Sequence, residues 1–136
     1  MALLIDSSIF IEAERRQLDL PAIVELAPSG EPLAVAAVTV SELLVGVRLA
    51  LPAARQVERE AFVERITEEF PILSFDLDVA RVYAEVWASL RLAGNVIPPH
   101  DLMIGATALT NGFDVLTHNV RDFSRIPGLR VREPGW

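Results

Sequence analysis

The 136-residue sequence contains no cysteine, so it forms no disulfide bond and no thiolate metal site. Hydrophobic residues make up 51% of the chain, yet no apolar run approaches the roughly 18 residues that a membrane span requires. No basic segment precedes the short apolar stretch at the N-terminus, and Asp6 interrupts that stretch, so we expect no signal peptide. These absences favour a cytoplasmic protein without a membrane partner.

Lysine is also absent: all twelve basic residues are arginines, and the net charge is −7. A chain this acidic does not hold nucleic acid by bulk electrostatics, so a role on nucleic acid needs local positive charge or metal ions. Arginine suits bidentate phosphate contacts, although a GC-rich genome explains the bias equally well. Aromatic residues are only 7% of the chain and the core needs several of them, so no platform for base stacking is evident.

Apolar segments of strand length alternate with helical patterns along the chain. We expect strands at residues 2–5, 33–38, 72–75, 114–117 and 129–131, helices that begin near residues 9, 21, 39, 52, 76 and 98, and a polar loop at 118–125. The fully apolar first strand is typical of a sheet that is covered on both faces. The sequence therefore predicts a single domain over residues 1–136, a three-layer α/β fold whose mainly parallel sheet is flanked by helices.

Four acidic residues fall at one edge of this predicted sheet, beyond the carboxyl ends of its strands. Asp6 ends the first strand, and Glu42 opens the helix after the second. Asp101 lies at or near the N-cap of the helix that starts at Pro98, and Asp122 lies in the loop after the fourth strand. Most of the other acids fall on exposed helix faces, so this convergence is the functional signal.

Four carboxylates brought together repel one another unless a cation neutralises them. Oxygen ligands without clusters of histidine or cysteine point to a hard divalent ion, Mg²⁺ or Mn²⁺, rather than to zinc. Such an ion activates water, holds the phosphate and stabilises the leaving oxygen when a phosphodiester is hydrolysed. It would also supply the positive charge that an acidic protein needs near a polyanion.

Each acid also has a purely structural interpretation. Asp101 would cap its helix. Glu42 would complete a capping box with Thr39, and Asp122 would cap a turn. Asp6 is the hardest to explain in this way, because a carboxylate that closes an apolar strand is costly to bury.

The remaining polar candidates carry weaker signals. We expect His100 and His118 to be polar lining, and Asn119 to be either a side chain that supports a ligand or a turn residue. Six arginines lie near the predicted active edge or on helices that leave it, where they contact phosphate or are simply solvated. These are Arg15, Arg16, Arg48, Arg91, Arg121 and Arg125.

Five short motifs follow one another along the chain: residues 3–8 (LLIDSS), 38–43 (VTVSEL), 100–108 (HDLMIGATA), 116–123 (LTHNVRDF) and 126–129 (IPGL). In these motifs the sequence resembles the PIN-domain ribonucleases of the VapC toxin family, the toxic half of bacterial toxin–antitoxin pairs. Each motif is weak alone, but together they are specific.

The resemblance implies an endoribonuclease that depends on Mg²⁺ or Mn²⁺ and cleaves RNA with metal-activated water. The acidic positions of the family are occupied here by Asp6, Glu42, Asp101 and Asp122. Asp6 and Asp101 would be the main metal ligands, and the other two acids would support them. Thr117 and Asn119 fall on polar positions of the family, and either Asn119 or Asp122 takes the fourth ligand position.

Members of this family usually form dimers and are silenced by a VapB-type antitoxin. The resemblance therefore implies a complex with the antitoxin that is a heterotetramer or larger, in which the helix at 52–70 forms a clip over the antitoxin groove. Independently, the high apolar content and the apolar stripe at 79–90 indicate more hydrophobic surface than one monomer can bury, which predicts a homodimer.

Two other classes of function stay open: a PIN-type DNA nuclease, and a catalytically silent PIN-like module that binds RNA or an antitoxin. The complete set of four acids argues against the silent module. A phosphatase of the haloacid type needs an Asp-x-Asp loop, and here Asp6 is followed by Ser7 and Ser8, which largely removes that class.

Overall fold

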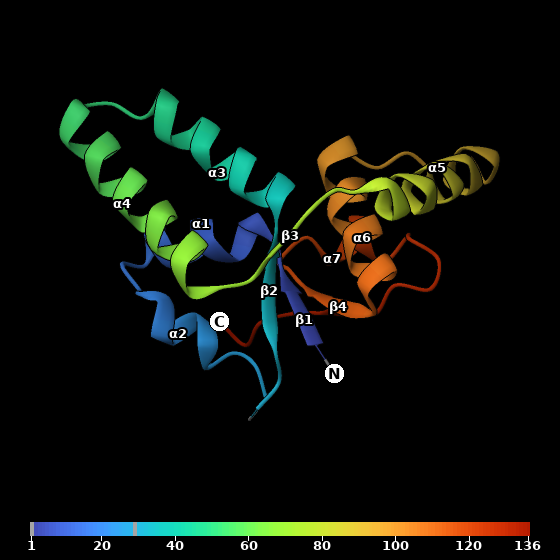
Figure 1. Cartoon of the computed structure of the whole chain (residues 1–136), viewed down its shortest axis with the longest axis horizontal. Helices are drawn as coiled ribbons and strands as arrows, with labels where there is room; N and C mark the ends of the chain where they lie inside the picture. Colours follow the sequence, from blue (N-terminus) through green and yellow to red (C-terminus); the bar gives the residue numbers. More distant parts are fainter. Residues whose placement is uncertain (1, 29) are drawn as a thin grey trace.

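In the computed structural model, which describes residues 2–28 and 30–136, five parallel strands form one sheet in the order β3-β2-β1-β4-β5 (Figure 1). The strands are β1 (Ala2–Ile5), β2 (Leu33–Ala36), β3 (Ile72–Leu73), β4 (Phe113–Leu116) and β5 (Val131–Arg132). The helices are α1 (Ser7–Arg15), α2 (Leu20–Val24), α3 (Ala37–Leu49), α4 (Ala53–Glu69), α5 (Leu77–Leu92), α6 (Pro99–Asn111) and α7 (Val120–Phe123). Because every strand pair is parallel, the carboxyl ends of the strands meet at one edge of the sheet.

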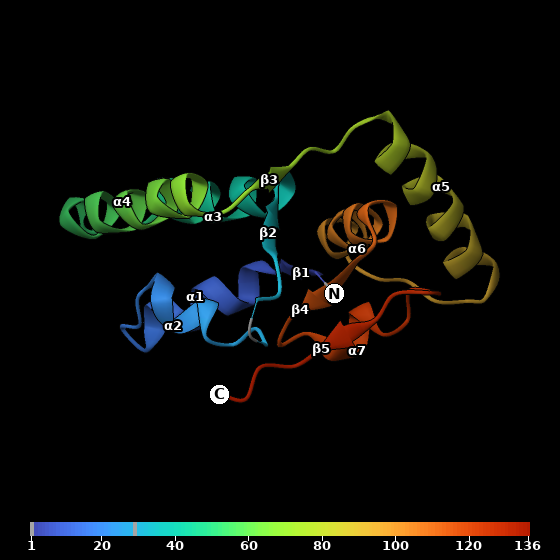
Figure 2. The same ribbon diagram turned by 60° about the horizontal axis from the view of Figure 1, so that its bottom comes forward.

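Helices cover both faces of the sheet, which confirms the predicted three-layer α/β fold. Figures 1 and 2 show α1, α2 and α4 on one side of the sheet and α5, α6 and α7 on the other. Successive side chains of β1 point to opposite faces. Leu3 packs in a cluster with Phe10 and Ile66 on the first side, and Leu4 packs with Ile104 on the second. The hydrophobic core therefore consists of two clusters, with the sheet between them.

The start of α3 differs from the predicted one. Strand β2 passes directly into α3, so the N-cap is Ala36 and Thr39 lies inside the first turn. The Thr39 side chain is fully buried, and its hydroxyl has no hydrogen-bond partner. The predicted capping box of Thr39 with Glu42 is therefore wrong, because Thr39 packs into the protein instead of capping the helix.

The two predicted site acids in the second half of the chain, Asp101 and Asp122, each lie in the first turn of a helix. Helix α6 has Pro98 as its N-cap, so Asp101 is part of the first turn rather than the cap. Residues 118–125, predicted as a loop, contain the short helix α7, whose first turn includes Asp122. The physical reason is Phe123, which is fully buried and holds this segment against the core.

The two long helices agree closely with the predicted ones. Helix α4 covers most of the expected 52–70 segment, and Asp76 caps α5 by accepting a hydrogen bond of 3.0 Å from the backbone N–H of Val79. Helix α5 buries Val86 and Leu90 against the core and leaves Trp87 43% exposed. Within the part of the chain that the structure describes, no helix is both long and apolar enough to cross a membrane.

Candidate active site

Asp6 is buried at the point where β1 ends and α1 begins. Its side chain is the N-cap of α1 and accepts a hydrogen bond of 3.3 Å from the backbone N–H of Ser8. The hydroxyl of Thr117, at the end of β4, donates to the same carboxylate oxygen, Oδ2, at 2.8 Å. The other oxygen, Oδ1, is buried and has no hydrogen-bond partner. Asp6 therefore presents one satisfied and one unsatisfied carboxylate oxygen at the edge of the sheet.

Glu42 reaches the same edge from the second turn of α3. The hydroxyl of Ser7 donates to its Oε2 at 3.5 Å, whereas Oε1 is buried without a hydrogen-bond partner. Burial raises the pKa of Glu42, and the charge of Asp6 raises it further. Glu42 and Asp6 thus lie close enough for their charges to interact.

Asn119 joins the two remaining acids. Its side-chain amide donates to Oδ2 of Asp101 at 2.7 Å and to Oδ2 of Asp122 at 3.1 Å. Asp101 comes from α6 and Asp122 from α7, so one amide group holds the starts of two helices together. Burial raises the pKa of Asp101 to about 6, and the charges of Asp6, Glu42 and Asp122 contribute in that order. The structure therefore brings all four predicted acids together.

A chain of hydroxyl and backbone groups connects α1 to the segment after β4. The Ser8 hydroxyl lies 3.3 Å from the Thr117 hydroxyl and accepts the backbone N–H of His118 at 3.1 Å. The Thr117 hydroxyl accepts the backbone N–H of Asn119 at 2.8 Å. Ser7 and Ser8 are not among the predicted site residues, although their position directly after Asp6 is a signal that could identify them.

The donor set suits a hard divalent cation, although its side chains as they stand do not form a complete ligand shell. Among residues 2–28 and 30–136, no group of three or more acidic or histidine side chains is arranged to hold a metal ion. Two buried oxygens, Asp6 Oδ1 and Glu42 Oε1, nevertheless have no hydrogen bond, and burying a carboxylate oxygen without a partner costs free energy that a bound cation would offset. All four acids offer only oxygen, which fits Mg²⁺ or Mn²⁺.

The six predicted arginines lie in different surroundings. Arg121 and Arg125 flank Asp122, and Arg125 lies 4.0 Å from its carboxylate. Arg15 and Arg16, at the end of α1, both pair with Glu12. The remaining two interact elsewhere: Arg48 pairs with Glu60 of α4, and Arg91 packs over Trp87 of α5.

The two histidines are both exposed. His100 lies in the first turn of α6, one residue before Asp101, and its charge lowers the pKa of Glu42. The ring of His118 lies against the ring of Trp136.

A groove of about 280 Å³ runs between α1 and the α3–α4 hairpin and reaches the acids at Glu42. Leu43, Val47, Phe62 and Val63 supply its apolar lining. Arg15, Arg59 and Glu14 supply its charged lining. The groove therefore offers an apolar surface that leads directly to the acidic site.

Comparison with known proteins decides the family. The sequence model of the PIN domain matches residues 3–129, and "Ribonuclease VapC1" of Rickettsia felis is 34% identical over 96% of this chain and 95% of its own length. The chain belongs to the VapC group of the PIN-domain family. A second VapC relative, "tRNA(fMet)-specific endonuclease VapC" of Salmonella typhimurium, is 31% identical over 74% of each chain.

A solved VapC structure has the same fold. VapBC-5 of Mycobacterium tuberculosis, described as a member of the VapBC family of toxin-antitoxin systems, is 30% identical, with a TM-score of 0.76 and 98% of both chains covered. The PIN-domain match includes Asp6, Glu42, Asp101 and Asp122 but ends before Trp136. The four acids therefore lie within the matched range of residues 3–129, and Trp136 lies outside that range.

Proposed function

We propose that this VapC-group protein is a metal-dependent endoribonuclease, the toxin of a VapBC-type toxin–antitoxin pair, which acts in the cytoplasm as a single PIN domain over residues 1–136. One observation carries the proposal: Asp6 Oδ1 and Glu42 Oε1 are buried without hydrogen bonds, next to Asp101 with its raised pKa. Carboxylates grouped in this way repel one another, and a bound cation relieves that repulsion at a pH where all of them are charged. The names of the two VapC relatives, a ribonuclease and a tRNA-specific endonuclease, support RNA as the substrate.

The cation that we propose is Mg²⁺ or Mn²⁺, which when bound supplies an activated water and neutralises charge on the phosphate. The proposed ligands are Asp6 and Asp101 as the main ones, with Glu42 and Asp122 in support. Thr117 orients Asp6 through its hydroxyl, and Asn119 orients Asp101 and Asp122 through its amide. These hydrogen bonds fix ligand positions before the substrate arrives.

The arginines beside the acids would hold the RNA backbone. Arg121 and Arg125 are adjacent to Asp122, so they are best placed for the phosphates that flank the scissile bond. Arg15 and Arg16 lie at the end of α1, the helix whose start is capped by Asp6. Arg48 and Arg91 interact with Glu60 and Trp87 instead, so we assign them no role in RNA binding.

The groove between α1 and the α3–α4 hairpin is our proposed site for a VapB-type antitoxin. Its apolar lining suits an amphipathic segment, and its end at Glu42 would let a basic side chain of that segment reach the acids. The similarity to VapBC-5, a toxin–antitoxin complex, supports such a partner. Occupation of the groove would then block the site.

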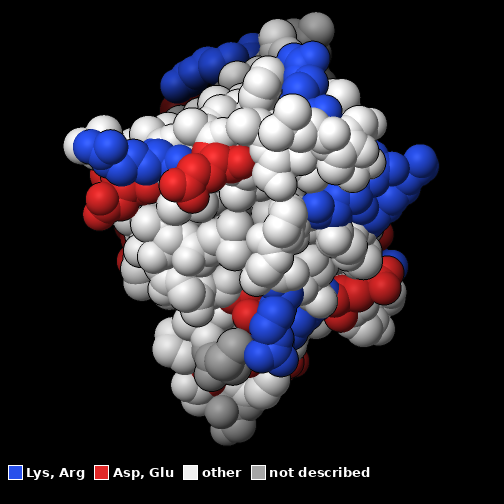
Figure 3. Space-filling model, turned by 90° about the vertical axis from the view of Figure 1, so that its right-hand side faces the viewer, with Lys and Arg blue, Asp and Glu red and all other residues white. Residues whose placement is uncertain are grey.

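We also propose a homodimer through the face that carries α5. Leu77, Leu92 and Val96 are 66%, 89% and 74% exposed. Figure 3 looks onto this face and shows uncharged side chains over much of it, with charged groups of both signs around them. Pairing of this apolar surface in a dimer would remove it from water, and the antitoxin complex would then be a heterotetramer or larger.

The test is incubation of the antitoxin-free protein with total bacterial RNA, in Mg²⁺, in Mn²⁺ and in EDTA, followed by mapping of the cut ends. We expect cleavage in either metal, none in EDTA and none by Asp101→Asn, which preserves the shape of the side chain. Cleavage that survives EDTA or Asp101→Asn would exclude the four-acid mechanism. A parallel incubation with single-stranded and duplex DNA tests the PIN-type DNA nuclease.

The catalytically silent module is tested by growth on expression. If wild type and Asp101→Asn both arrest growth to the same extent without RNA cleavage, the protein acts by binding alone. The complete set of four acids, with two oxygens left unsatisfied, favours the nuclease.

A further inference from the structure

Three side chains, from the end of α1, the segment after β4 and the last part of the chain, form a cluster. One of them, His118, lies in the chain between Thr117 and Asn119, which contact two of the four acids. The rings of His118 and Trp136 lie 6.0 Å apart between centroids, with an angle of 39° between their planes. The guanidinium of Arg16 lies 5.8 Å from the centroid of the Trp136 ring. We call His118, Trp136 and Arg16 the aromatic cluster. Its members are distant in sequence, which is why the composition alone indicated no stacking platform.

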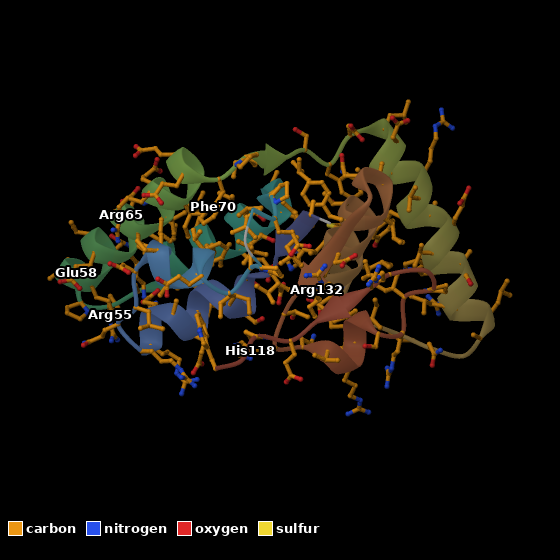
Figure 4. All side chains as sticks on the ribbon, turned by 90° about the horizontal axis from the view of Figure 1, so that it is seen from below. Arg55, Glu58, Arg65, Phe70, His118 and Arg132 are labelled. Carbon is orange, nitrogen blue, oxygen red and sulfur yellow. The ribbon has the colours of Figure 1, made fainter. Side chains whose placement is uncertain are left out.

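Both neighbours of His118 in the chain hold it next to the acids. Thr117 donates to Asp6, and Asn119 donates to Asp101. The backbone N–H of His118 itself donates to a serine hydroxyl of α1 at 3.1 Å. The ring of His118 is exposed, and Figure 4 shows it at the periphery of the molecule. An exposed aromatic ring is therefore held within one residue of the groups that position two proposed metal ligands.

The other two members of the aromatic cluster are Trp136, which packs against the core, and Arg16, which carries positive charge. Trp136 is partly buried against the core cluster that packs on α1. Arg16 pairs with Glu12 at 2.9 Å and keeps 48% of its side chain exposed. Glu12 also pairs with Arg15, at 3.3 Å, so two arginines share one carboxylate and a net positive charge remains.

We propose that the aromatic cluster is a subsite for single-stranded RNA, in which a nucleobase stacks on the His118–Trp136 pair and Arg16 contacts the adjoining phosphate. The inference rests on the proposed function and extends it to the strand on one side of the scissile bond. Aromatic rings with a guanidinium nearby stack bases of any sequence and neutralise phosphate. A single strand fits because the bases of a duplex are already stacked on each other.

The charge distribution favours RNA over an acidic or neutral protein segment at this place. The chain carries a net charge of −7, so a polyanion must approach where positive side chains are concentrated. Asp6 caps the start of α1, whereas Arg15 and Arg16 lie at its other end, so a strand that passes the acids can continue along this helix to reach them. The apolar groove at Glu42 involves other residues, α3 and α4 among them, which leaves the aromatic cluster free for substrate.

Tryptophan fluorescence tests the stacking directly, because the chain has only two tryptophans. In an Asp101→Asn protein, which binds without cutting, Trp87→Phe leaves Trp136 as the only reporter, and Trp136→Phe leaves only Trp87. We expect a mixed-sequence, single-stranded 12-mer RNA to quench Trp136 and to leave Trp87 unchanged. Anisotropy of the same RNA, fluorescently labelled, measures binding independently of stacking.

Steady-state KM and kcat for RNA cleavage show whether the residues of the aromatic cluster position the substrate or only support the fold. We expect His118→Ala and Arg16→Gln to raise KM by roughly 5-fold or more, with kcat changed by less than about twofold. Trp136→Phe should leave KM close to the wild-type value, because phenylalanine still stacks. Trp136→Ala should raise KM, because the aromatic ring is removed. His118 and Arg16 are exposed, so their variants remain informative if Trp136→Ala does not fold. Trp87→Phe, which removes the indole of the Arg91 pair on α5, is the matched control.

The outcomes distinguish this proposal from the proposed function. RNA that binds by anisotropy without quenching Trp136, or variants with unchanged KM, would overturn the subsite and leave the nuclease intact. A wild-type protein that stacks RNA on Trp136 but cuts none would contradict the nuclease and leave the subsite standing. If His118→Ala weakens the complex with the antitoxin but not the affinity for RNA, the aromatic cluster is a protein contact and the proposal is wrong.

Discussion

The side-chain amide of Asn119 donates a hydrogen bond of 2.7 Å to Oδ2 of Asp101. The same nitrogen donates to Asp122, so an uncharged amide lies between two carboxylates that would otherwise face each other directly. The hydrogen bond from Asn119 lowers the pKa of Asp101, against the larger effects of burial and the other acids that raise it. Asn119 therefore favours the charged form of Asp101, which is the form that binds a cation, although the pKa stays raised to about 6 overall.

Asn119→Ala should weaken metal binding. Without the amide, Asp101 and Asp122 lose their shared donor, so we expect the Mg²⁺ concentration for half-maximal cleavage to rise by roughly 10- to 100-fold. Asp122→Asn is the companion variant: a larger rise for Asp122→Asn identifies Asp122 as the fourth ligand, and a larger rise for Asn119→Ala identifies Asn119. Metal dependence that stays at the wild-type value in Asn119→Ala would contradict the assigned role.

The effect of Mg²⁺ on thermal stability should depend on pH. The pKa of Asp101 in the folded metal-free protein is raised from 3.8 to about 6, so this carboxyl group favours folding while protonated. The contribution of this carboxyl group to the stability of the folded protein is fully present below about pH 4 and is lost as the pH rises through about 6. Mg²⁺ replaces the missing proton, so we expect it to raise Tm at pH 7.5 and to have little effect at pH 5.

Melting curves with Mg²⁺ and with EDTA at both pH values measure this difference. Asp101→Asn is the control, because an amide in place of the carboxylate removes this titration, and the pH dependence of the Mg²⁺ effect should shrink. An equal rise of Tm at pH 5 and pH 7.5 in the wild type would show that the cation binds away from these acids.

Gly105→Ala should destabilise the protein and reduce cleavage together. A Cβ at Gly105 would collide with Cδ1 of Ile126, which follows α7 in the chain and is buried in the second core cluster. Overpacking lowers the free energy of unfolding by about 1–3 kcal/mol, and the higher helix propensity of alanine raises it by about 1 kcal/mol. We therefore expect a net decrease of about 1 kcal/mol. Cleavage falls because α6 carries Asp101, one turn before Gly105.

Denaturant unfolding of the double variant Gly105→Ala/Ile126→Val checks the cause. Ile126→Val deletes the colliding atom, so the two changes should cost less together than the sum of their separate effects. Gly46→Ala in α3, where a Cβ meets nothing within 4 Å, should be neutral or stabilising. If the losses in free energy of unfolding of the two single variants simply add in the double variant, the collision with Ile126 does not explain why residue 105 is glycine.

Arg132→Ala should lower stability without changing the chemistry of the site. Arg132, near the centre of the view in Figure 4, donates to the buried Asp114 at 2.8 Å and to Glu31 at 2.7 and 2.9 Å. Removing the cation leaves the buried Asp114 without its ion-pair partner, at a cost of roughly 2–3 kcal/mol. This is less than for a fully buried pair, because 29% of the Arg132 side chain is exposed.

Arg130→Ala is the matched control, since Arg130 is exposed and lies two positions earlier. It should change the free energy of unfolding by less than about 0.5 kcal/mol. Asp114 lies near the start of β4, away from Thr117 at its end, so kcat per folded molecule should stay at the wild-type value for both variants. A loss of kcat in Arg132→Ala at a temperature where it is fully folded would link this ion cluster to the site.

Much of the fold followed from local patterns. The apolar run at 2–5 and the patterns of α4 and α5 were strong, because each element is long or strictly apolar and Asp76 caps α5. The errors fell where packing overrides local preference: Thr39 is drawn into the core instead of capping, and Phe123 turns a polar loop into a helix.

The sequence by itself determined which acids lie at the edge of the sheet, because strand ends and helix starts are set by local pattern and parallel strands end on the same side. Only the tertiary structure decided which groups touch those acids. Ser7, Thr117 and Asn119 reach Glu42, Asp6 and Asp101 from other elements, and Trp136 meets His118 and Arg16 across the chain. Such contacts depend on side-chain directions and on the packing of several elements at once, which no local pattern records.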